Sequence, residues 1–210
     1  EDRLTNPYRT WEYCVQYRET DFNFISRMME QEGIYYFFKH ENGKHTLVLA
    51  DSVSAHEPYT NYEIIKYRPY KAEENEETIL QWHTEFNLLT GTYTLNGFDF
   101  KNTEKDLITR SSIARDHILS DFELFDYPGK YDDFSDGEKY SKMRIEELQA
   151  QYEVATGFSD ARGIMTGATF TLAECPREDQ NKEYLIISAN YSLDAGAFES
   201  VNEGSGKLTY

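Results

Sequence analysis

The chain has 210 residues and a formal net charge of −17 at pH 7, from 21 basic and 38 acidic side chains. This balance disfavours nucleic acid and anionic membrane surfaces as partners, because both are negatively charged and no basic stripe offsets the repulsion. No run of about 18 apolar residues occurs, which excludes a membrane-spanning helix from the predicted elements. The 17 tyrosines and 13 phenylalanines favour β-sheet, and the length allows one large or two small domains.

The first predicted elements are a strand over residues 13–18 and a helix over residues 22–32. Asp21 is the predicted N-cap, because its side-chain oxygen can accept a hydrogen bond from the first helical turn. Gly33 ends the helix, since glycine enters the left-handed conformation without steric cost. The apolar residues follow one helical face: Phe22, Ile25, Met28 and Met29. The polar residues fall largely on the other side: Arg27, Glu30, Gln31 and Glu32.

Residues 34–40 and 45–50 are predicted to form a β-hairpin around Asn42-Gly43, a pair that favours a type I′ turn with two positive φ angles. A two-residue turn fixes the register of the strands. The predicted cross-strand pairs are Glu41 with Lys44, His40 with His45, Phe38 with Leu47, and Phe37 with Val48. Both faces of the hairpin are apolar, so we expect both to be covered.

The remainder of the chain is predicted to be mostly strands. The charged run 71–77 reads as a solvated loop between a strand-helix-hairpin part, residues 1–71, and a second β-rich, barrel-like part, residues 72–210. Pro128-Gly129 fits a type II turn, and a second helix opens at residues 135–137. Strands are predicted at residues 64–70, 78–86, 92–100, 168–173 and 184–193, and residues 201–210 have linker composition. The predicted fold class is α+β, mostly β, with two helices.

Two cysteines, Cys14 and Cys175, lie far apart and outside any Cys-x-x-Cys or Cys/His cluster. We expect reduced thiols, while the sequence alone leaves a bridge between them open. Such cysteine use is typical of folding in a reducing compartment. The polar first residues contain no signal peptide, and a strand near residues 11–17 needs pairing partners, so we expect the chain to be an internal fragment of a longer protein.

His40 and His45 are the sharpest candidates for a metal site, because the hairpin register places them opposite each other, within reach of one cation. Two histidines are half of a typical zinc site. A zinc site would need further ligands, and the acidic residues near in sequence are Glu41 and Asp51. Glu41 points to the other face of the hairpin, which leaves Asp51. We favour an ordinary cross-strand pair near an exposed turn, and predict no metal site and no cofactor.

An acidic cluster lies around Gly137 and superficially resembles a calcium loop. Its members are Asp132, Asp133, Asp136 and Glu138. The spacing of the EF-hand pattern is not met, and a helix N-cap with acidic residues in the first turn explains the same side chains. The cluster therefore predicts the start of a helix.

Several aromatic groups have the side chains needed to stack on sugars or bases: Trp82 with His83, Tyr35-Tyr36, and Tyr67 with Tyr70. Packing in cores and interfaces is the commoner use of such side chains. Gly-x-Ser-x-Gly, Walker A and Gly-x-Gly-x-x-Gly patterns are absent. We therefore predict a structural or interaction protein without catalytic residues. A carbohydrate hydrolase, with two carboxylates in a cleft, is kept as a remote alternative.

One long stretch carries a specific resemblance, namely residues 13–52, YCVQYRETDFNFISRMMEQEGIYYFFKHENGKHTLVLADS. Further segments continue it in order: GFDFKNTEKDL (97–107), FDYPGKYDDFSDGEKYSKMRIEELQAQ (125–151), GATFTL (167–172) and CPREDQNKEYLIISANYS (175–192). Together they resemble the VgrG family, the spike proteins of the bacterial type VI secretion system. That family is similar to the baseplate hub of contractile-tailed phages, and the resemblance covers nearly the whole chain.

The resemblance implies phage baseplate-hub-like barrel domains in a homotrimer, with two barrel-like domains per chain building a pseudo-sixfold ring. It implies that the ring docks on the hexameric Hcp tube. It also implies a needle that carries a tip protein, punctures target membranes and delivers effectors. In family members a β-rich region precedes the part matched here, and a small barrel and the needle follow it. Contacts with the tip protein and with effectors are therefore expected outside this chain.

The resemblance further implies a mechanical role without turnover, and contact with a target membrane through the spike tip alone. It implies a location in the bacterial cytoplasm before firing, followed by secretion or translocation into target cells. A phage or phage-like tail baseplate hub is the alternative within the same class. No catalytic, cofactor-binding, metal-binding or tube-contacting residue is predicted.

Overall fold

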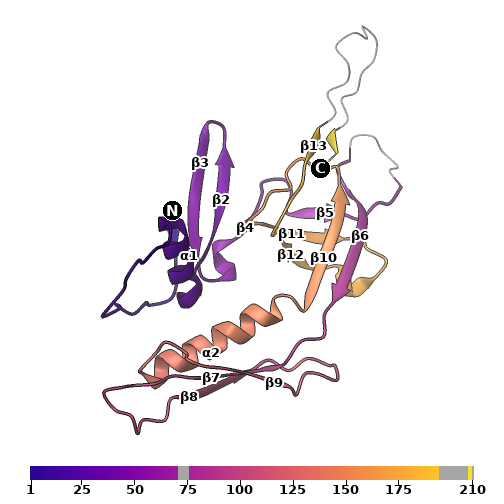
Figure 1. The fold of residues 1–210 in the computed structure, drawn as a ribbon. Helices are drawn as coiled ribbons and strands as arrows, with labels where there is room; N and C mark the ends of the chain where they lie inside the picture. The colour runs from indigo at the N-terminus through magenta and orange to yellow at the C-terminus, as the bar shows by residue number, and fades with distance from the viewer. Residues whose placement is uncertain (71–75, 194–207, 210) are drawn as a thin grey trace. The chain divides into compact units, whose positions relative to one another are not determined.

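The computed structural model describes residues 1–70, 76–193 and 208–209, which form mostly strands and two long helices (Figure 1). The predicted fold class, α+β and mostly β, is confirmed. The helices are α1 (Asp21–Glu32) and α2 (Phe134–Gln149), with short 3-10 helices η1 (Val53–Ala55) and η2 (Glu178–Gln180). The strands are β1 (Asp2–Arg3), β2 (Tyr35–Glu41), β3 (Lys44–Ala50), β4 (Glu57–Pro58), β5 (Ile64–Lys66), β6 (Ile79–Phe86), β7 (Thr92–Asn96), β8 (Ile108–Ser112), β9 (Glu123–Asp126), β10 (Glu153–Ser159), β11 (Ala168–Ala173), β12 (Glu183–Leu185), β13 (Ser192–Leu193) and β14 (Leu208–Thr209).

The chain forms two compact units, each built from segments that are distant in sequence. Unit 1 contains residues 1–7, 35–83 and the described residues from 155 onward, and unit 2 contains residues 8–34 and 84–154. The predicted division at residue 71 rests on a different feature, the charged run 71–77, of which residues 71–75 lie outside the described part. That division stays a prediction, and each compact unit takes segments from both sides of it.

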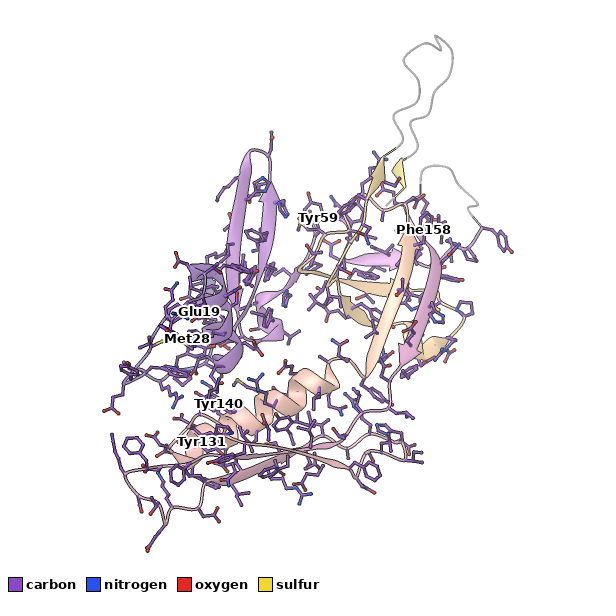
Figure 2. The ribbon with its side chains drawn as sticks, in the orientation of Figure 1. Glu19, Met28, Tyr59, Tyr131, Tyr140 and Phe158 are labelled. Atoms are coloured by element: carbon purple, nitrogen blue, oxygen red, sulfur yellow. The ribbon has the colours of Figure 1, made fainter. Side chains whose placement is uncertain are left out.

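Unit 2 is built on a helix that packs against a three-stranded sheet (Figure 1). Strand β7 is central, antiparallel to β8 and parallel to β9, and α2 contacts β7 and β8. The buried core consists of Tyr93, Leu95, Leu107, Tyr131, Tyr140 and Ile145. Figure 2 labels Tyr131 and Tyr140, whose ring centroids are 6.2 Å apart. The predicted second helix is confirmed, because α2 begins at Phe134.

Helix α1 confirms the predicted end and corrects the predicted start. Gly33 adopts the left-handed conformation, with φ 73° and ψ 25°. Thr20, and not Asp21, is the N-cap, since its hydroxyl accepts a hydrogen bond from the Asn23 amide at 3.2 Å. The prediction missed by one residue because both residue types serve as caps and the local sequence does not decide between neighbours.

The predicted strand over residues 13–18 is wrong, because this segment has no regular structure. Tyr13 and Tyr17 are 80% and 72% exposed. The segment is held instead through its backbone, where Arg27 Nη2 donates to the Val15 carbonyl at 2.8 Å. A strand requires a second segment with which to pair, and alternation of residues alone does not supply one.

The hairpin of β2 and β3 confirms all of the predicted cross-strand pairs. The predicted turn type, however, is wrong. Gly43 has a φ of 74°, and Asn42 does not share this positive φ. A single positive φ at the second central position matches a type II turn rather than type I′. Strand β1 adds to the hairpin, parallel to β3.

The turn geometry predicts that Asn42→Pro leaves the hairpin intact. Proline favours the first central position of a type II turn, and the preceding Glu41 already lies in a strand, as proline requires. We expect urea unfolding to give a free energy equal to that of the wild type, or higher by about 0.4–1 kcal/mol. A type I′ turn needs a positive φ at residue 42, which proline cannot adopt. A marked loss of stability would therefore contradict the type II assignment.

Strand β11 is central to the larger sheet of unit 1 and confirms the predicted strand at residues 168–173. It pairs antiparallel with β12 on one edge and parallel with β4 and β5 on the other. The core beside it consists of Ile65, Ile79, Ala161, Phe170 and Leu172. Strand β6 confirms the strand predicted at residues 78–86, and it pairs with β10.

The predicted long strand at residues 184–193 is wrong, because only β12 and β13 form there and residues 186–191 lie outside any strand. Ile187 is 71% exposed, so the apolar run does not continue as a buried strand. The predicted type II turn at Pro128-Gly129 is also wrong. A type II turn needs a positive φ at its second central residue, which would be Gly129, whereas the positive φ falls on Lys130, at 55°. The linker prediction for residues 201–210 falls outside the described residues, except for β14.

Candidate functional site

The hairpin brings His40 and His45 together, as its register predicts. Their Nδ1 atoms lie 2.6 Å apart, and their ring centroids 4.8 Å apart. In the described part of the chain, no group of three or more His, Cys, Asp or Glu side chains is placed to hold a metal ion. Cys14 and Cys175 are both free thiols, as expected.

The acidic cluster before α2 is a helix cap, as predicted. Asp133 Oδ1 accepts hydrogen bonds from the Ser135 amide at 2.9 Å and from the Ser135 hydroxyl at 2.7 Å. These two bonds lower the pKa of the Asp133 carboxyl, which favours its ionised form at the positive end of the helix dipole. Asp136 Oδ2 lies 3.4 Å from Arg9 Nη1. The cluster therefore begins a helix and anchors a neighbouring arginine.

Unit 2 buries a carboxylate that the sequence pattern assigned to the polar face of α1. Glu32 is 8% exposed. Its Oε1 accepts hydrogen bonds from Trp11 Nε1 and Tyr140 Oη, both at 2.8 Å. Arg9 Nε lies 3.6 Å from Oε1, and Lys139 Nζ lies 3.7 Å from Oε2. Two cations thus offset the cost of burying this charge.

Arg9 connects this carboxylate to the aromatic side chains around it. The guanidinium carbon lies 4.4 Å from the Trp11 ring centroid and 5.3 Å from that of Tyr140. Arg9 Nη2 also donates to the Lys130 carbonyl at 2.9 Å. We refer to five side chains as the Glu32 network: Arg9, Trp11, Glu32, Lys139 and Tyr140. The network joins residues 8–11, the end of α1 and α2 inside one unit.

The chemistry of the Glu32 network favours stability over turnover. Both carboxylate oxygens have cationic or hydrogen-bonding partners. Burial, and to a smaller extent the hydrogen bond to Glu32, raises the pKa of Tyr140. A general base needs a free acceptor within hydrogen-bond reach of a substrate proton. In the described structure Trp11 and Tyr140 occupy Oε1, while Oε2 is buried and faces Lys139 Nζ at 3.7 Å without a hydrogen bond, so the arrangement holds segments together.

Three buried tyrosines in unit 2 predict a loss of stability at alkaline pH. Burial raises the pKa of Tyr93 to about 12, with a further contribution from Asp126, and burial also raises the pKa of Tyr131 and Tyr140. In the unfolded chain a tyrosine hydroxyl ionises at about pH 10. Above that pH the unfolded state binds fewer protons than the folded state. The contribution of the neutral hydroxyls is therefore complete below about pH 10 and is lost as the pH rises toward 12.

Urea unfolding followed at a series of alkaline pH values measures this effect. We expect the midpoint to fall above about pH 10, and to fall less steeply in a Tyr93→Phe variant, which has one raised pKa fewer. An identical slope for Tyr93→Phe and the wild type would contradict the assignment to Tyr93.

Two grooves flank the Glu32 network within unit 2. The first, of about 350 Å³, follows the apolar face of α1, including Phe24, Met28 and Met29. Figure 2 labels Met28 on this helix. The second, of about 610 Å³, is lined by aromatic side chains, including Tyr13, Phe98, Phe100 and Tyr127, and by charged ones, including Arg9 and Asp132. Exposed apolar surface of this kind is typical of sites that another macromolecule covers.

The hairpin of unit 1 has one buried and one open face. Val48 and Ala50 are fully buried, whereas Phe38 and Leu47 on the opposite face are 40% and 42% exposed. The expectation that both faces are covered is therefore wrong for the described chain. The open face adds a second apolar surface to those of unit 2.

The aromatic groups considered as stacking sites are largely used in packing. Trp82 lies edge-on to Phe170 and Tyr184, with ring centroids 6.1 and 4.8 Å apart. Tyr67 packs against the same core. Tyr35 Oη donates to the Ser52 carbonyl at 2.9 Å. The structure therefore supports the packing interpretation for Trp82 and Tyr67, whereas Tyr70 is 88% exposed and does not pack in this core.

Comparison with known proteins adds evidence beyond the geometry. A family model described as the phage tail baseplate hub (GPD) matches residues 1–197. The type VI secretion system spike protein VgrG1b of Pseudomonas aeruginosa is 46% identical over 207 residues, which is 98% of this chain and 28% of that protein. Spike protein VgrG3 of Vibrio cholerae is 31% identical over 205 residues, 95% of this chain and 20% of that protein. The actin cross-linking toxin VgrG1 of Vibrio cholerae is 29% identical over 203 residues, 95% of this chain and 18% of the toxin.

A solved structure shares the fold. The c3393 protein of E. coli superposes with a TM-score of 0.55 at 15% identity, covering 88% of this chain and 36% of that one. That protein is described as a component of the type VI secretion system with structural similarity to the T4 bacteriophage tail proteins gp27 and gp5. The present chain thus spans less than a third of the three relatives compared by sequence.

Proposed function

The chain belongs to the phage tail baseplate hub family, and on this premise we propose that it is the hub part of a type VI secretion system spike. The observation that carries the proposal is the family match over residues 1–197 together with 46% identity to a spike protein across 98% of the chain. The hub-like fold supports the same role.

In this role three copies of the protein form a ring that docks on the hexameric Hcp tube. Two barrel-like domains in each of three chains, which the resemblance to the spike family implies, would provide six positions and match the symmetry of a hexamer. The open face of the hairpin and the two grooves of unit 2 support an assembled state, because such apolar surface is usually covered by a partner. Tip protein, effectors and the target membrane contact regions of the spike outside this chain.

The proposed work is mechanical and involves no turnover by this chain. The hub transmits the force of sheath contraction, resides in the bacterial cytoplasm before firing, and is then secreted or translocated into the target cell. A net charge of −17 supports a role without nucleic acid. One relative is named as an actin cross-linking toxin, of which this chain spans 18%, and we assign such activity to other parts of that protein.

Deletion of the gene in the bacterium that encodes it tests the proposal. The parent strain should lack its other spike genes, so that redundancy does not hide the effect. We expect Hcp to disappear from the culture medium and to return when the intact gene is supplied. Unchanged release of Hcp in the deletion strain would overturn the proposed role.

A phage tail hub is the second candidate, because the matching family model is described as a phage tail baseplate hub. The two functions predict different particles. A phage hub purifies with virions that contain DNA, whereas a secretion hub is released together with Hcp. Recovery of the protein only in virions would favour the phage.

A further inference from the structure

The histidine pair lies at one of the positions of the hairpin where facing side chains approach closely. Glu41 and Lys44 flank the two-residue turn, and His40 and His45 form the next pair. In antiparallel strands hydrogen-bonded and non-hydrogen-bonded pairs alternate, and the pair after the one that closes a two-residue turn is non-hydrogen-bonded. Such residues have Cα atoms only about 4.5 Å apart, so their side chains lie on one face and in contact.

The two imidazoles direct their nitrogens at a single point. The Nδ1 atoms are 2.6 Å apart, and both histidines are exposed. Within the described residues neither ring has another hydrogen bond or ion pair. His56 differs, because its Nε2 contacts Tyr35 Oη and its Nδ1 contacts the Gly167 carbonyl, both at 2.8 Å. Among the described residues, His40 and His45 thus combine convergent nitrogens with open access, which His56 does not.

We propose that His40 and His45 form a two-histidine site for a borderline divalent metal ion such as Ni²⁺ or Zn²⁺. The ion takes the place of the hydrogen now shared between the two Nδ1 atoms. Tetrahedral zinc with nitrogen ligands at about 2.0–2.1 Å separates two ligand atoms by about 3.3 Å. The two Nδ1 atoms, now 2.6 Å apart, must therefore move apart by about 0.7 Å, which exposed side chains near a turn can do by rotation about their χ angles.

Binding of the metal ion to the two imidazoles conserves charge and atoms and needs no further reactant. In the neutral pair one ring carries its proton on Nδ1 and the other on Nε2. Coordination through both Nδ1 atoms requires the first ring to move its proton to Nε2 through solvent. Water completes the coordination sphere, because the protein supplies two ligands.

The chemistry of the pair selects the class of metal. Imidazole suits nickel, copper and zinc, whereas carboxylate and water suit magnesium and calcium. Lys44 is the nearest cation on the turn, and it lies 3.8 Å from Glu41, which offsets its charge. The acidic surface concentrates divalent cations in general, but only the histidines distinguish Ni²⁺ and Zn²⁺ from Mg²⁺.

Isothermal titration of the tag-free, EDTA-treated chain with Ni²⁺ and with Zn²⁺, in excess Mg²⁺, tests the proposal. We expect one saturable site per chain that His40→Ala or His45→Ala weakens at least tenfold. His83→Ala is the matched control, since His83 is an exposed strand histidine outside the pair, and it should change the affinity less than twofold. Ni²⁺ should also raise the urea midpoint of the wild type but not of the two pair variants.

Two results would overturn the assignment. One is the absence of saturable binding in the wild type. The other is binding that survives in both His40→Ala and His45→Ala, which would place the ion on the free cysteines or on the acidic surface. A circular dichroism spectrum equal to that of the wild type shows that each variant is folded, so a loss of binding can be assigned to the lost ligand.

Discussion

Gly33→Ala is expected to lower the free energy of unfolding by about 2 kcal/mol or more. The left-handed conformation of Gly33, with φ 73°, costs an L-residue about 1–2 kcal/mol. A Cβ atom at this position would also lie 2.2 Å from Met143 Sδ, so the side chain of α2 has to move. Urea unfolding followed by circular dichroism measures the loss.

Gly43→Ala is the matched control for this prediction. Gly43 has nearly the same φ, 74°, and a Cβ added there meets no atom within 4 Å. The free energy of unfolding lost by Gly43→Ala therefore reports the cost of the backbone conformation alone. Any additional free energy lost by Gly33→Ala reports the contact with Met143. Met143→Ala should remove that excess in a double-mutant cycle. Equal losses for Gly33→Ala and Gly43→Ala would show that the packing of α1 against α2 leaves room for a methyl group.

Glu32→Ala is expected to have the largest effect of any single change in the Glu32 network. Removing one partner of a buried ion pair costs about 3–5 kcal/mol, because the remaining charge is left without compensation. Here Arg9 and Lys139 lose their carboxylate, and the hydroxyl of Tyr140 loses its acceptor. Glu32→Gln retains one oxygen acceptor and should cost less than Glu32→Ala.

Glu30→Ala is the control, because Glu30 lies on the same helix with a side chain that is 66% exposed and 3.8 Å from Arg144. Exposed ion pairs contribute about 0–1 kcal/mol, so this variant should unfold close to the wild type. A similar small loss for Glu32→Ala and Glu30→Ala would contradict the role assigned to the network.

The features that sequence reasoning predicted correctly are set by neighbouring residues. The register of β2 and β3 follows from the length of one turn, and the end of α1 follows from a glycine at the last turn. His40 and His45 meet for the same reason, because only five positions separate them. Local rules act over such distances without help from the rest of the fold.

The features that were missed depend on partners far away in the sequence. Glu32 was assigned to the polar side of α1, but it follows Met28 by one helical turn and lines the same groove as Met28 and Met29. Trp11 and Tyr140, which are 21 and 108 positions away, bury it there. Strand β9 has four residues and pairs in parallel with β7, so it carries little periodic signal of its own. The segment 13–18 has strand-like alternation but no segment to pair with. No single-sequence pattern encodes these long-range contacts.

The residue patterns alone indicate an acidic, β-rich scaffold and contain no catalytic motif. The resemblance over most of the chain led to the spike family, and the match of residues 1–197 to the hub family agrees with it. Exposed apolar side chains such as Phe38 and Leu47 agree with that assignment, because they are typical of a surface that a partner covers.

The absolute mass of the full-length protein in solution shows whether it forms a symmetric hub. Light scattering coupled to size-exclusion chromatography gives this mass without assumptions about shape. We expect three copies per particle over a wide range of protein concentration. A strictly monomeric intact protein would contradict the trimeric hub and with it the proposed docking on a hexameric tube.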